Sequence, residues 1–389
     1  MKHSATKVFT LLILIVWLGN VAYAGDKPAS ANSTYSLPVD SPKKEQAAPA
    51  PAPQMLTYPI SSITAKMTLN GYTQVRFQDF EDGDPKTRNS FDIRNARLIL
   101  RGTVLKNISY NFQCDFAPPT VRLMDGTFAY TINKFAKFTA GQQKVPLSYE
   151  SLRTDYDIHS MSRSQVVEAL TARSKDVVAT AASTTAVNNN GRDIGLLFSG
   201  GVPNQKTQST WVDYYLGVFD GMGINVTDKD ESKDIGGRVV AHPIKNLSIG
   251  GSYYDGSATY GIDLSKPKNR NRMGFDIAYE DGKRIYAAAE YLQGTDSTTD
   301  RAGYYILAEG FFLPKKFSAL VKYDFYDPNK SNNSDGTNND ATIVYSFALN
   351  WYFAQFTKVQ VQYDFKHEDG AQAIQKHNDL FSIQAQVFF

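Results

Sequence analysis

Arginine and lysine side chains are the residues of this chain whose type and spacing suggest a chemistry. They recur on the polar side of segments in which polar and apolar residues alternate. A guanidinium presents forked donors that match the oxygens of phosphate, and an ammonium adds a compact positive charge. The candidate anion-binding residues are Arg76, Arg97, Arg101, Lys144, Ser148 and Arg238.

Other charged residues share this polar side. Two adjacent pairs, Arg192 with Asp193 and Lys233 with Asp234, are more simply interpreted as structural ion pairs that pin a loop to a wall. The remaining basic candidates are Arg272, Lys322, Lys358 and Lys366, and the acidic ones are Asp115, Asp125, Asp213, Asp276, Glu280, Glu290, Glu309 and Asp364. If the sheet closes, the first two strands lie beside the last ones. This arrangement predicts a basic side and, around Glu290 and Glu309, an acidic side.

The elements that would position these residues are β-strands. From Thr357 to Lys366, odd positions are apolar and even positions polar, the two-residue period of a strand with one apolar and one wet face. On every clear strand we expect the inward face to be hydrophilic. Sixteen strands are predicted, at residues 66–78, 92–102, 109–116, 122–132, 136–144, 192–200, 211–219, 234–242, 247–255, 272–280, 284–292, 302–312, 317–326, 341–352, 356–367 and 379–389.

Short and long connections alternate between these strands, as periplasmic turns and external loops do in a transmembrane barrel. A soluble sandwich would also bury one face of each strand. Aromatic residues gathered at strand ends, such as Trp351 and Tyr352, favour a closed antiparallel barrel in a membrane instead. The predicted fold class is therefore an all-β transmembrane barrel of about sixteen strands.

The N-terminal part of the chain predicts export. Residues 1–24 combine Lys2 and Lys7 with an apolar run and Ala22-Tyr23-Ala24, which predicts a cleaved signal peptide. Residues 25–60 are rich in Pro and Ala and predict a disordered periplasmic linker, and residues 61–389 form the barrel. Without Lys2 and Lys7, 39 basic residues balance 39 acidic ones, so no affinity for nucleic acid is implied.

One long connection separates the fifth and sixth strands. Residues 145–190 hold a stretch compatible with a helix, from Ser162 to Ala179, and both charge signs. In a closed barrel such a segment can fold inward and narrow the passage, which is where a pore selects its solutes. An external lid or a disordered loop is the alternative.

Enzymatic and metal-binding functions have little support. His3 is lost with the predicted signal peptide, and in the rest of the chain His159-Ser160 is the only adjacent pair of a base and a nucleophile, with no motif around it. No metal-ligand spacing or phosphate-cradling loop is present, so no cofactor is expected. A tether between outer membrane and cell wall would depend on the Pro/Ala segment alone. These observations favour a passive channel.

Several stretches resemble the phosphate-selective porin O and P family of Gram-negative outer membranes. They are residues 91–98 with Gly102, 141–150, 191–195, and Lys233-Asp234 followed by Arg238 and His242-Pro243. The resemblance implies a sixteen-stranded homotrimer among outer-membrane lipids. It also implies a third external loop folded into the lumen, an inward Lys144, and uptake of small anions such as phosphate. Phe389 would be read by the outer-membrane assembly machinery.

The chain departs from this family at one point. The family commonly carries paired arginines where this chain has Arg94-Asn95, so one cation of that strand is missing. A general diffusion porin for small hydrophilic solutes is therefore the alternative function.

Overall fold

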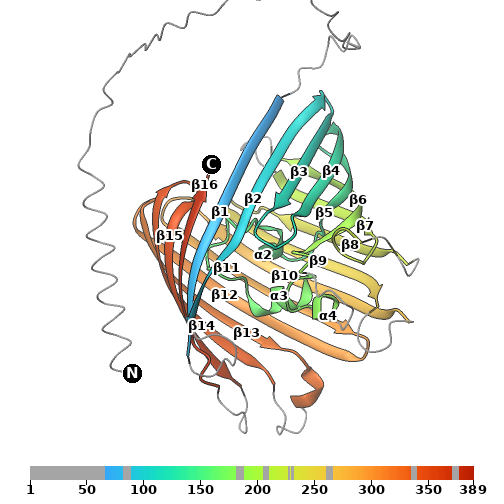
Figure 1. The fold of residues 1–389 in the computed structure, drawn as a ribbon. Helices are drawn as coiled ribbons and strands as arrows, with labels where there is room; N and C mark the ends of the chain where they lie inside the picture. The colour runs from blue at the N-terminus through green and yellow to red at the C-terminus, as the bar shows by residue number, and fades with distance from the viewer. Residues whose placement is uncertain are drawn as a thin grey trace, which may run out of the picture. The chain divides into compact units, whose positions relative to one another are not determined.

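The computed structural model describes residues 66–81, 89–180, 188–204, 210–226, 228, 232–259, 266–333, 340–369 and 376–389. The predicted signal peptide and linker lie outside these residues. Sixteen antiparallel strands form a closed barrel in which each strand pairs with its neighbours in sequence and β1 pairs with β16 (Figure 1). The strands are β1 (Lys66–Phe80), β2 (Asn89–Leu105), β3 (Ile108–Asp115), β4 (Arg122–Asn133), β5 (Ala136–Lys144), β6 (Arg192–Pro203), β7 (Thr210–Phe219), β8 (Asp234–Ala241), β9 (Leu247–Ala258), β10 (Lys268–Glu280), β11 (Ile285–Asp296), β12 (Thr299–Leu313), β13 (Phe317–Asp327), β14 (Thr342–Ala354), β15 (Thr357–Glu368) and β16 (Leu380–Phe388).

This arrangement confirms the predicted fold class, and every predicted strand overlaps an observed one. The two ends of the barrel differ. One end, here the turn end, carries short connections such as residues 281–284 between β10 and β11; the other, the loop end, carries residues 145–191 between β5 and β6. In the turn at 281–284, Asp281 accepts hydrogen bonds from the backbone of Lys283, Arg284 and Ile285, and these bonds lower the pKa of its carboxyl group.

The strands carry opposite chemistry on their two faces. On β16, Ser382, Gln384 and Gln386 are buried inside the barrel, whereas Val387 on the opposite face is 54% exposed. Large apolar side chains are exposed on the outer face of most strands, which is the distribution that a lipid-facing barrel needs. No helix in the described part of the chain is long and apolar enough to cross a membrane.

The inner face departs from the expected pattern over β10 to β14. An apolar patch covers this part of the wall, so the prediction of a hydrophilic inner face on every clear strand is wrong here. The patch comprises Ala278, Tyr286, Ala288, Leu292, Tyr305, Leu307, Leu320 and Ala348. A helix packs on it and removes these side chains from water, as described below.

The seam between β1 and β16 is closed by the last residue of the chain. Gly71 and Phe389 exchange backbone hydrogen bonds of 2.8 and 2.9 Å. The Phe389 ring lies across Gly71, so that a Cβ atom at position 71 would come within 2.5 Å of it. The absence of a side chain at Gly71 therefore gives the terminal ring its place on the lipid-facing surface.

We expect Gly71→Val to weaken the seam, because the added side chain must displace the Phe389 ring. Overpacking of this kind costs about 1–3 kcal/mol. Urea unfolding in lipid vesicles should show the loss. In a Phe389→Ala background the same substitution should cost clearly less, and Thr73→Val, on the same strand, should leave stability nearly unchanged. An equal cost with and without Phe389 would contradict this role of Gly71.

Candidate functional site

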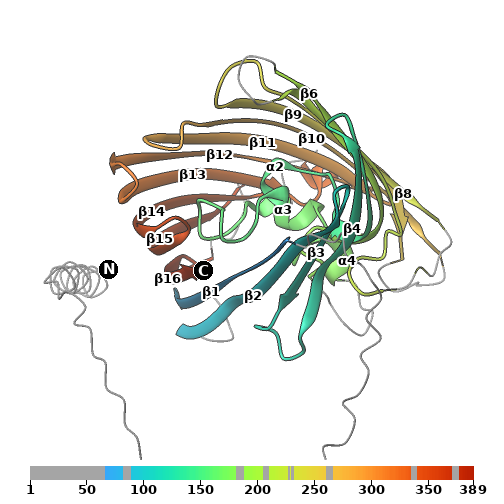
Figure 2. The ribbon, with the colours of Figure 1, turned by 90° about the horizontal axis from the view of Figure 1, so that it is seen from above.

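The connection between β5 and β6 packs against the inner wall of the barrel. Residues 145–180 of this connection are called the lumen segment here and contain α2 (Tyr149–Leu152), α3 (Gln165–Leu170) and α4 (Val177–Thr180). In the view of Figure 2, α2 and α3 lie inside the ring of strands. Hydrogen bonds join the segment to inward side chains of β1, β2, β5, β10, β11, β13, β15 and β16.

Charged wall residues hold both ends of α2. The backbone N–H groups of Tyr149 and Glu150 donate to the Glu290 carboxylate on β11 at 2.8 and 3.1 Å. At the other end, Lys144 Nζ on β5 donates to the carbonyls of Ser151, Leu152 and Arg153 at 3.1, 2.9 and 2.7 Å. A helix leaves N–H groups unpaired at its start and carbonyls unpaired at its end, so each charge sits where it is favourable.

The same arrangement recurs on α3. The N–H of Gln165 donates to both carboxylate oxygens of Asp324 at 3.1 and 3.0 Å, and Arg272 Nε donates to the Leu170 carbonyl at 3.0 Å. Between these contacts Val166, Val167 and Leu170 are completely buried on the apolar patch of the wall. Charge at the ends and apolar contact along the side therefore fix α3 in place.

The stretch of turns and bends between the two helices is held by its backbone. Amide and amino groups of the wall donate to its carbonyls: Gln74 to Asp155 at 3.0 Å, Gln386 to Tyr156 at 2.9 Å, Lys358 to Ile158 at 3.1 Å, and Gln360 to His159 at 2.7 Å. Gln362 accepts from the N–H of Met161 at 2.8 Å. Wall side chains from three adjacent strands therefore replace the backbone partners that a sheet would supply.

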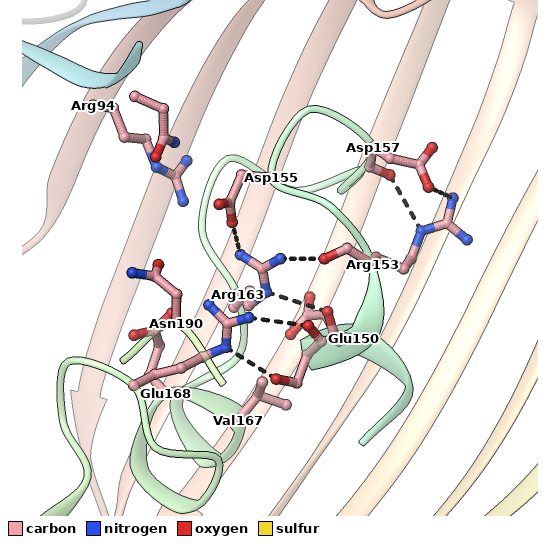
Figure 3. A network of polar contacts seen from close by, with 12 residues as sticks. Arg94, Glu150, Arg153, Asp155, Asp157, Arg163, Val167, Glu168 and Asn190 are labelled. Atoms are coloured by element: carbon pink, nitrogen blue, oxygen red, sulfur yellow. Dashed lines mark hydrogen bonds and ion pairs between the residues drawn. The ribbon is translucent and has the colours of Figure 1, made fainter. Parts of the chain in front are cut away.

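Asp155 joins ionic contacts of the lumen segment and of the wall. It pairs with Arg163 of the lumen segment (Figure 3) and, at 2.6 Å, with Arg97 of β2, which also pairs with Asp115 at 2.9 Å. Burial alone would raise the pKa of Asp155, but the guanidinium groups of Arg163 and Arg97 hold it well below its usual range. Asp155 therefore stays charged at any pH near neutrality.

A β-bulge in β2 brings another arginine to this place. Gln74 pairs with Asn95 and Val75 pairs with Ile93, so Arg94 is an extra residue that the opposite strand does not match. Bulges re-aim side chains, and here Arg94 reaches inward beside the buried Asn95. Its guanidinium donates to the Met161 carbonyl of the lumen segment.

These groups surround a cavity of about 270 Å³, here the arginine pocket. Five arginines and three carboxylates line it: Arg94, Arg97, Arg122, Arg163, Arg173, Asp115, Asp155 and Glu168. Among the described residues, Arg94, Arg122 and Arg173 have no carboxylate within ion-pair distance, and Arg122 Nε is buried without a hydrogen-bond partner. Burial and the neighbouring Arg163 lower the pKa of Arg173 to about 9, so its guanidinium is still positively charged at neutral pH. The pocket therefore carries an excess of positive charge.

A larger cavity of about 650 Å³ adjoins the arginine pocket and shares Arg94, Arg163 and Glu168 with it. Its lining from β13 to β16 mixes cations such as Lys322 and Lys366 with anions such as Asp324 and Asp364. Seven cations and five carboxylates line this wider space, so its excess of positive charge equals that of the arginine pocket in number but is spread over a larger volume.

The structure places the six sequence-predicted candidates differently. Arg97 lines the arginine pocket. The others are engaged elsewhere: Arg76 pairs with Asp92 at 2.6 Å, Arg101 donates to Asn111 at 3.0 Å, Lys144 holds the end of α2, Ser148 caps its start, and Arg238 pairs with Asp276 at 2.6 Å. Sequence reasoning did not select Arg94, Arg122, Arg163 or Arg173 as anion-binding residues. Two signals pointed to this place: the family's paired arginines at Arg94-Asn95, and the basic residues Arg163 and Arg173 of the long connection, which acidic residues of the same connection offset.

The residues expected to form ion pairs within Arg192-Asp193 and Lys233-Asp234 have other partners. Arg192 pairs with Asp125 of β4 at 2.7 Å, and Asp193 accepts from the backbone of Gly221 and Gly223. Lys233 pairs with Asp228, whereas Asp234 accepts from the Tyr254 hydroxyl and the N–H of Ser257. Asp193 therefore joins the connection between β7 and β8 to the wall, whereas Arg192 joins β6 to β4 and Asp234 joins β8 to β9.

The expected acidic side of the lumen is largely neutralised. Asp276 pairs with Arg238, Glu280 pairs with Arg153 at 3.1 Å, Glu290 receives the start of α2, and Glu309 bonds to His159. These carboxylates therefore serve the lumen segment and its neighbours rather than a solute.

Comparison with known proteins agrees with this geometry. Residues 66–259 match the model of the phosphate-selective porin O and P family. The resemblance seen in the sequence is thereby confirmed, and the match spans the described strands from β1 to β9. Family match and barrel fold together indicate an outer-membrane channel of the porin type and not an enzyme. No curated protein matches the sequence significantly.

Solved porin structures share the fold at low sequence identity. The channel DcaP of Acinetobacter baumannii is 10% identical with a TM-score of 0.58, and the match covers 84% of this chain and 97% of that one. A loop L8 deletion mutant of OmpT of Vibrio cholerae is 11% identical with a TM-score of 0.57, covering 84% and 99%. OmpF of Salmonella typhi is 12% identical with a TM-score of 0.56, covering 83% and 97%.

We expect Asp155→Asn to release the lumen segment, because Arg97 and Arg163 would lose the carboxylate they share. Breaking a buried pair from one side costs about 3–5 kcal/mol. The barrel should still fold, but single-channel current should become larger and noisier, and protease should cut within residues 145–190. Asp157→Asn is the matched control, since Arg153 keeps Glu280 as a partner.

The pH dependence of the wild-type porin follows from the same pair. A depressed pKa stabilises the folded state above the unfolded pKa, about 3.9, and that stabilisation is lost as the pH falls toward the folded pKa. The Asp155 pairs should therefore persist from pH 7 to pH 5, and the difference in conductance noise between the wild-type channel and Asp155→Asn should stay constant in this window. A difference that disappears at pH 5 would contradict the assignment.

Proposed function

We propose that this porin conducts small anions and that the arginine pocket is where it selects them. The observation that supports the proposal is the excess of five arginines over three carboxylates in a cavity between the lumen segment and β2 to β4. An arginine without a carboxylate partner offers forked donors to a phosphate or carboxylate solute. The lumen segment then acts as the constriction loop that brings solutes to these arginines.

The anion preference is expected to be moderate. Each unpaired arginine of the pocket also donates to a protein carbonyl or hydroxyl: Arg94 to Met161, Arg122 to Asn188, and Arg173 to Ser151. An anion would meet donors that are partly occupied, which favours passage over tight binding. A conducting site must bind well enough to admit an ion and weakly enough to release it. Phosphate is the anion that the family's name suggests.

A general diffusion porin for small hydrophilic solutes is the second candidate. The cavity of about 650 Å³ favours it, because cations and anions are mixed along that wall. A neutral solute crossing this space would meet both signs without a preference. The two candidates therefore differ in whether the arginine pocket or the wider cavity controls passage.

Assembly and export follow the porin pattern in this proposal. The chain would be exported by residues 1–24 to the outer membrane of a Gram-negative bacterium. Phe389 would be recognised by the assembly machinery, and the barrel would form a homotrimer among outer-membrane lipids. A trimer form is described for OmpT of Vibrio cholerae, whose fold this chain shares.

The proposal is tested by the reversal potential of planar bilayers across a KCl gradient, repeated with phosphate. The wild-type channel should prefer anions. A charge near a pore wall contributes on the order of 1 kcal/mol to an ion at close approach. Arg94→Gln combined with Arg173→Gln should therefore lower the anion to cation permeability ratio roughly fivefold or more.

Arg101→Gln serves as the matched control because Arg101 is exposed and donates to Asn111 outside the pocket. It should leave the ratio unchanged. Cation preference of the wild-type channel, or an equal loss in both variants, would refute the anion proposal. Equal permeability for both signs would favour general diffusion.

A further inference from the structure

A second cavity lies at the turn end of the lumen segment and shares no residue with the arginine pocket. Its volume is about 370 Å³, within the range of small-molecule sites. It is lined by residues 156–159 of the lumen segment and by the turn-end parts of β10, β11, β12, β14 and β15. We call it the aromatic pocket.

Six of its sixteen lining residues carry rings: Tyr156, Tyr286, Phe311, Tyr352 and Phe356, together with the His159 imidazole. His159 stacks on Tyr286 with ring centroids 3.5 Å apart and planes 4° apart, and Phe311 packs against Tyr352 at 5.6 Å. Contact with lipid does not explain these rings. On the adjacent outer face, Phe312 is 68% exposed, so the lipid-facing aromatic belt is built from other residues.

Charge around the pocket is also uneven. The carboxylates of Asp157 and Glu280 are both engaged by Arg153, at 2.9 and 3.1 Å. Two lysines at the turn end, Lys283 and Lys315, have no carboxylate within ion-pair distance in the described part of the chain. The buried ammonium of Lys358 donates to the Ile158 carbonyl and lies 5.6 Å from the centre of the Tyr352 ring. Positive groups therefore remain available around an aromatic cavity.

From this combination we infer that the aromatic pocket binds solutes that carry an aromatic ring and a carboxylate, such as benzoate. The ring packs against Phe311 and Tyr352, and the carboxylate faces Lys315 or Lys283. This inference extends the proposed anion conduction, but it rests on a different cavity. Failure of one does not imply failure of the other, because charge selectivity and preference for a ring are measured separately.

The experiment uses the full chain in planar bilayers and adds benzoate or cyclohexanecarboxylate on the turn side. Both are monocarboxylates with a six-membered ring, but only benzoate is planar and aromatic. Benzoate should reduce the chloride current at a concentration roughly two- to tenfold lower, the range that an aromatic pair contributes. Phe311→Leu should remove this difference. Phe312→Leu, one residue along and facing outward, should keep it.

The charge requirement is tested with Lys315→Gln, which should weaken block by both carboxylates and leave the preference for benzoate intact. Binding of benzoate to the detergent-purified porin, measured by calorimetry, gives the same ranking of variants without relying on current. Equal block by the two carboxylates would overturn the inference, as would an equal effect of Phe311→Leu and Phe312→Leu. Cation preference of the channel would refute anion conduction while leaving the ranking of the two carboxylates as the test of this pocket.

Discussion

Backbone hydrogen bonding inside the barrel is the constraint on which the rest of this structure depends. A chain that crosses the lumen at membrane depth is tolerated only where its N–H and C=O groups find partners in the protein or in water. Here the wall supplies them. Glu290 and Asp324 receive the starts of α2 and α3, Lys144 and Arg272 receive their ends, and glutamines of β1, β15 and β16 bind the stretch between. The inner wall is thus a complement to one particular segment.

This constraint decides which charges remain for a solute. Several inward charges, such as Lys322, Lys358 and Glu290, are used to fix the lumen segment. In the arginine pocket, Arg97 and Arg163 are balanced by the two carboxylates Asp115 and Asp155. The excess of positive charge comes from Arg94, Arg122 and Arg173, which have no carboxylate within ion-pair distance among the described residues and donate to groups of the connection between β5 and β6. The fixing of this connection and the proposed preference for anions therefore involve the same side chains.

The strands could be predicted from the sequence because a two-residue period is a local signal. Closure of β1 on β16 followed from the even number of strands.

The site could not be derived in the same way. Arg94 faces inward because a bulge shifts the pairing at Gln74 and Val75. The outward apolar residues of β2 change there from odd positions, Phe91 and Ile93, to even ones such as Leu98, and this change of parity spans too few residues to be recognised before the strand is placed. The partner of Arg192 is Asp125, 67 residues earlier, whereas the adjacent Asp193 binds backbone groups of a different loop. Register and loop path decide such pairs. The inner apolar patch was missed because Leu320 and Ala348 look like interruptions in a polar face until α3 is placed on them.

The lumen segment also separates two kinds of surface along the path of a solute. Asp155 and the residues from Ser162 onward contribute to the cavities beside β2 to β4 and toward the loop end, whereas Tyr156 to His159 face the turn end. The change occurs within a few residues because wall groups on adjacent strands hold successive carbonyls of the stretch, so each side chain has a fixed direction. An anion would meet arginines and aromatic rings at different depths. Neither contact then needs to be strong, since two weak sites in series slow a preferred solute at entry without retaining it.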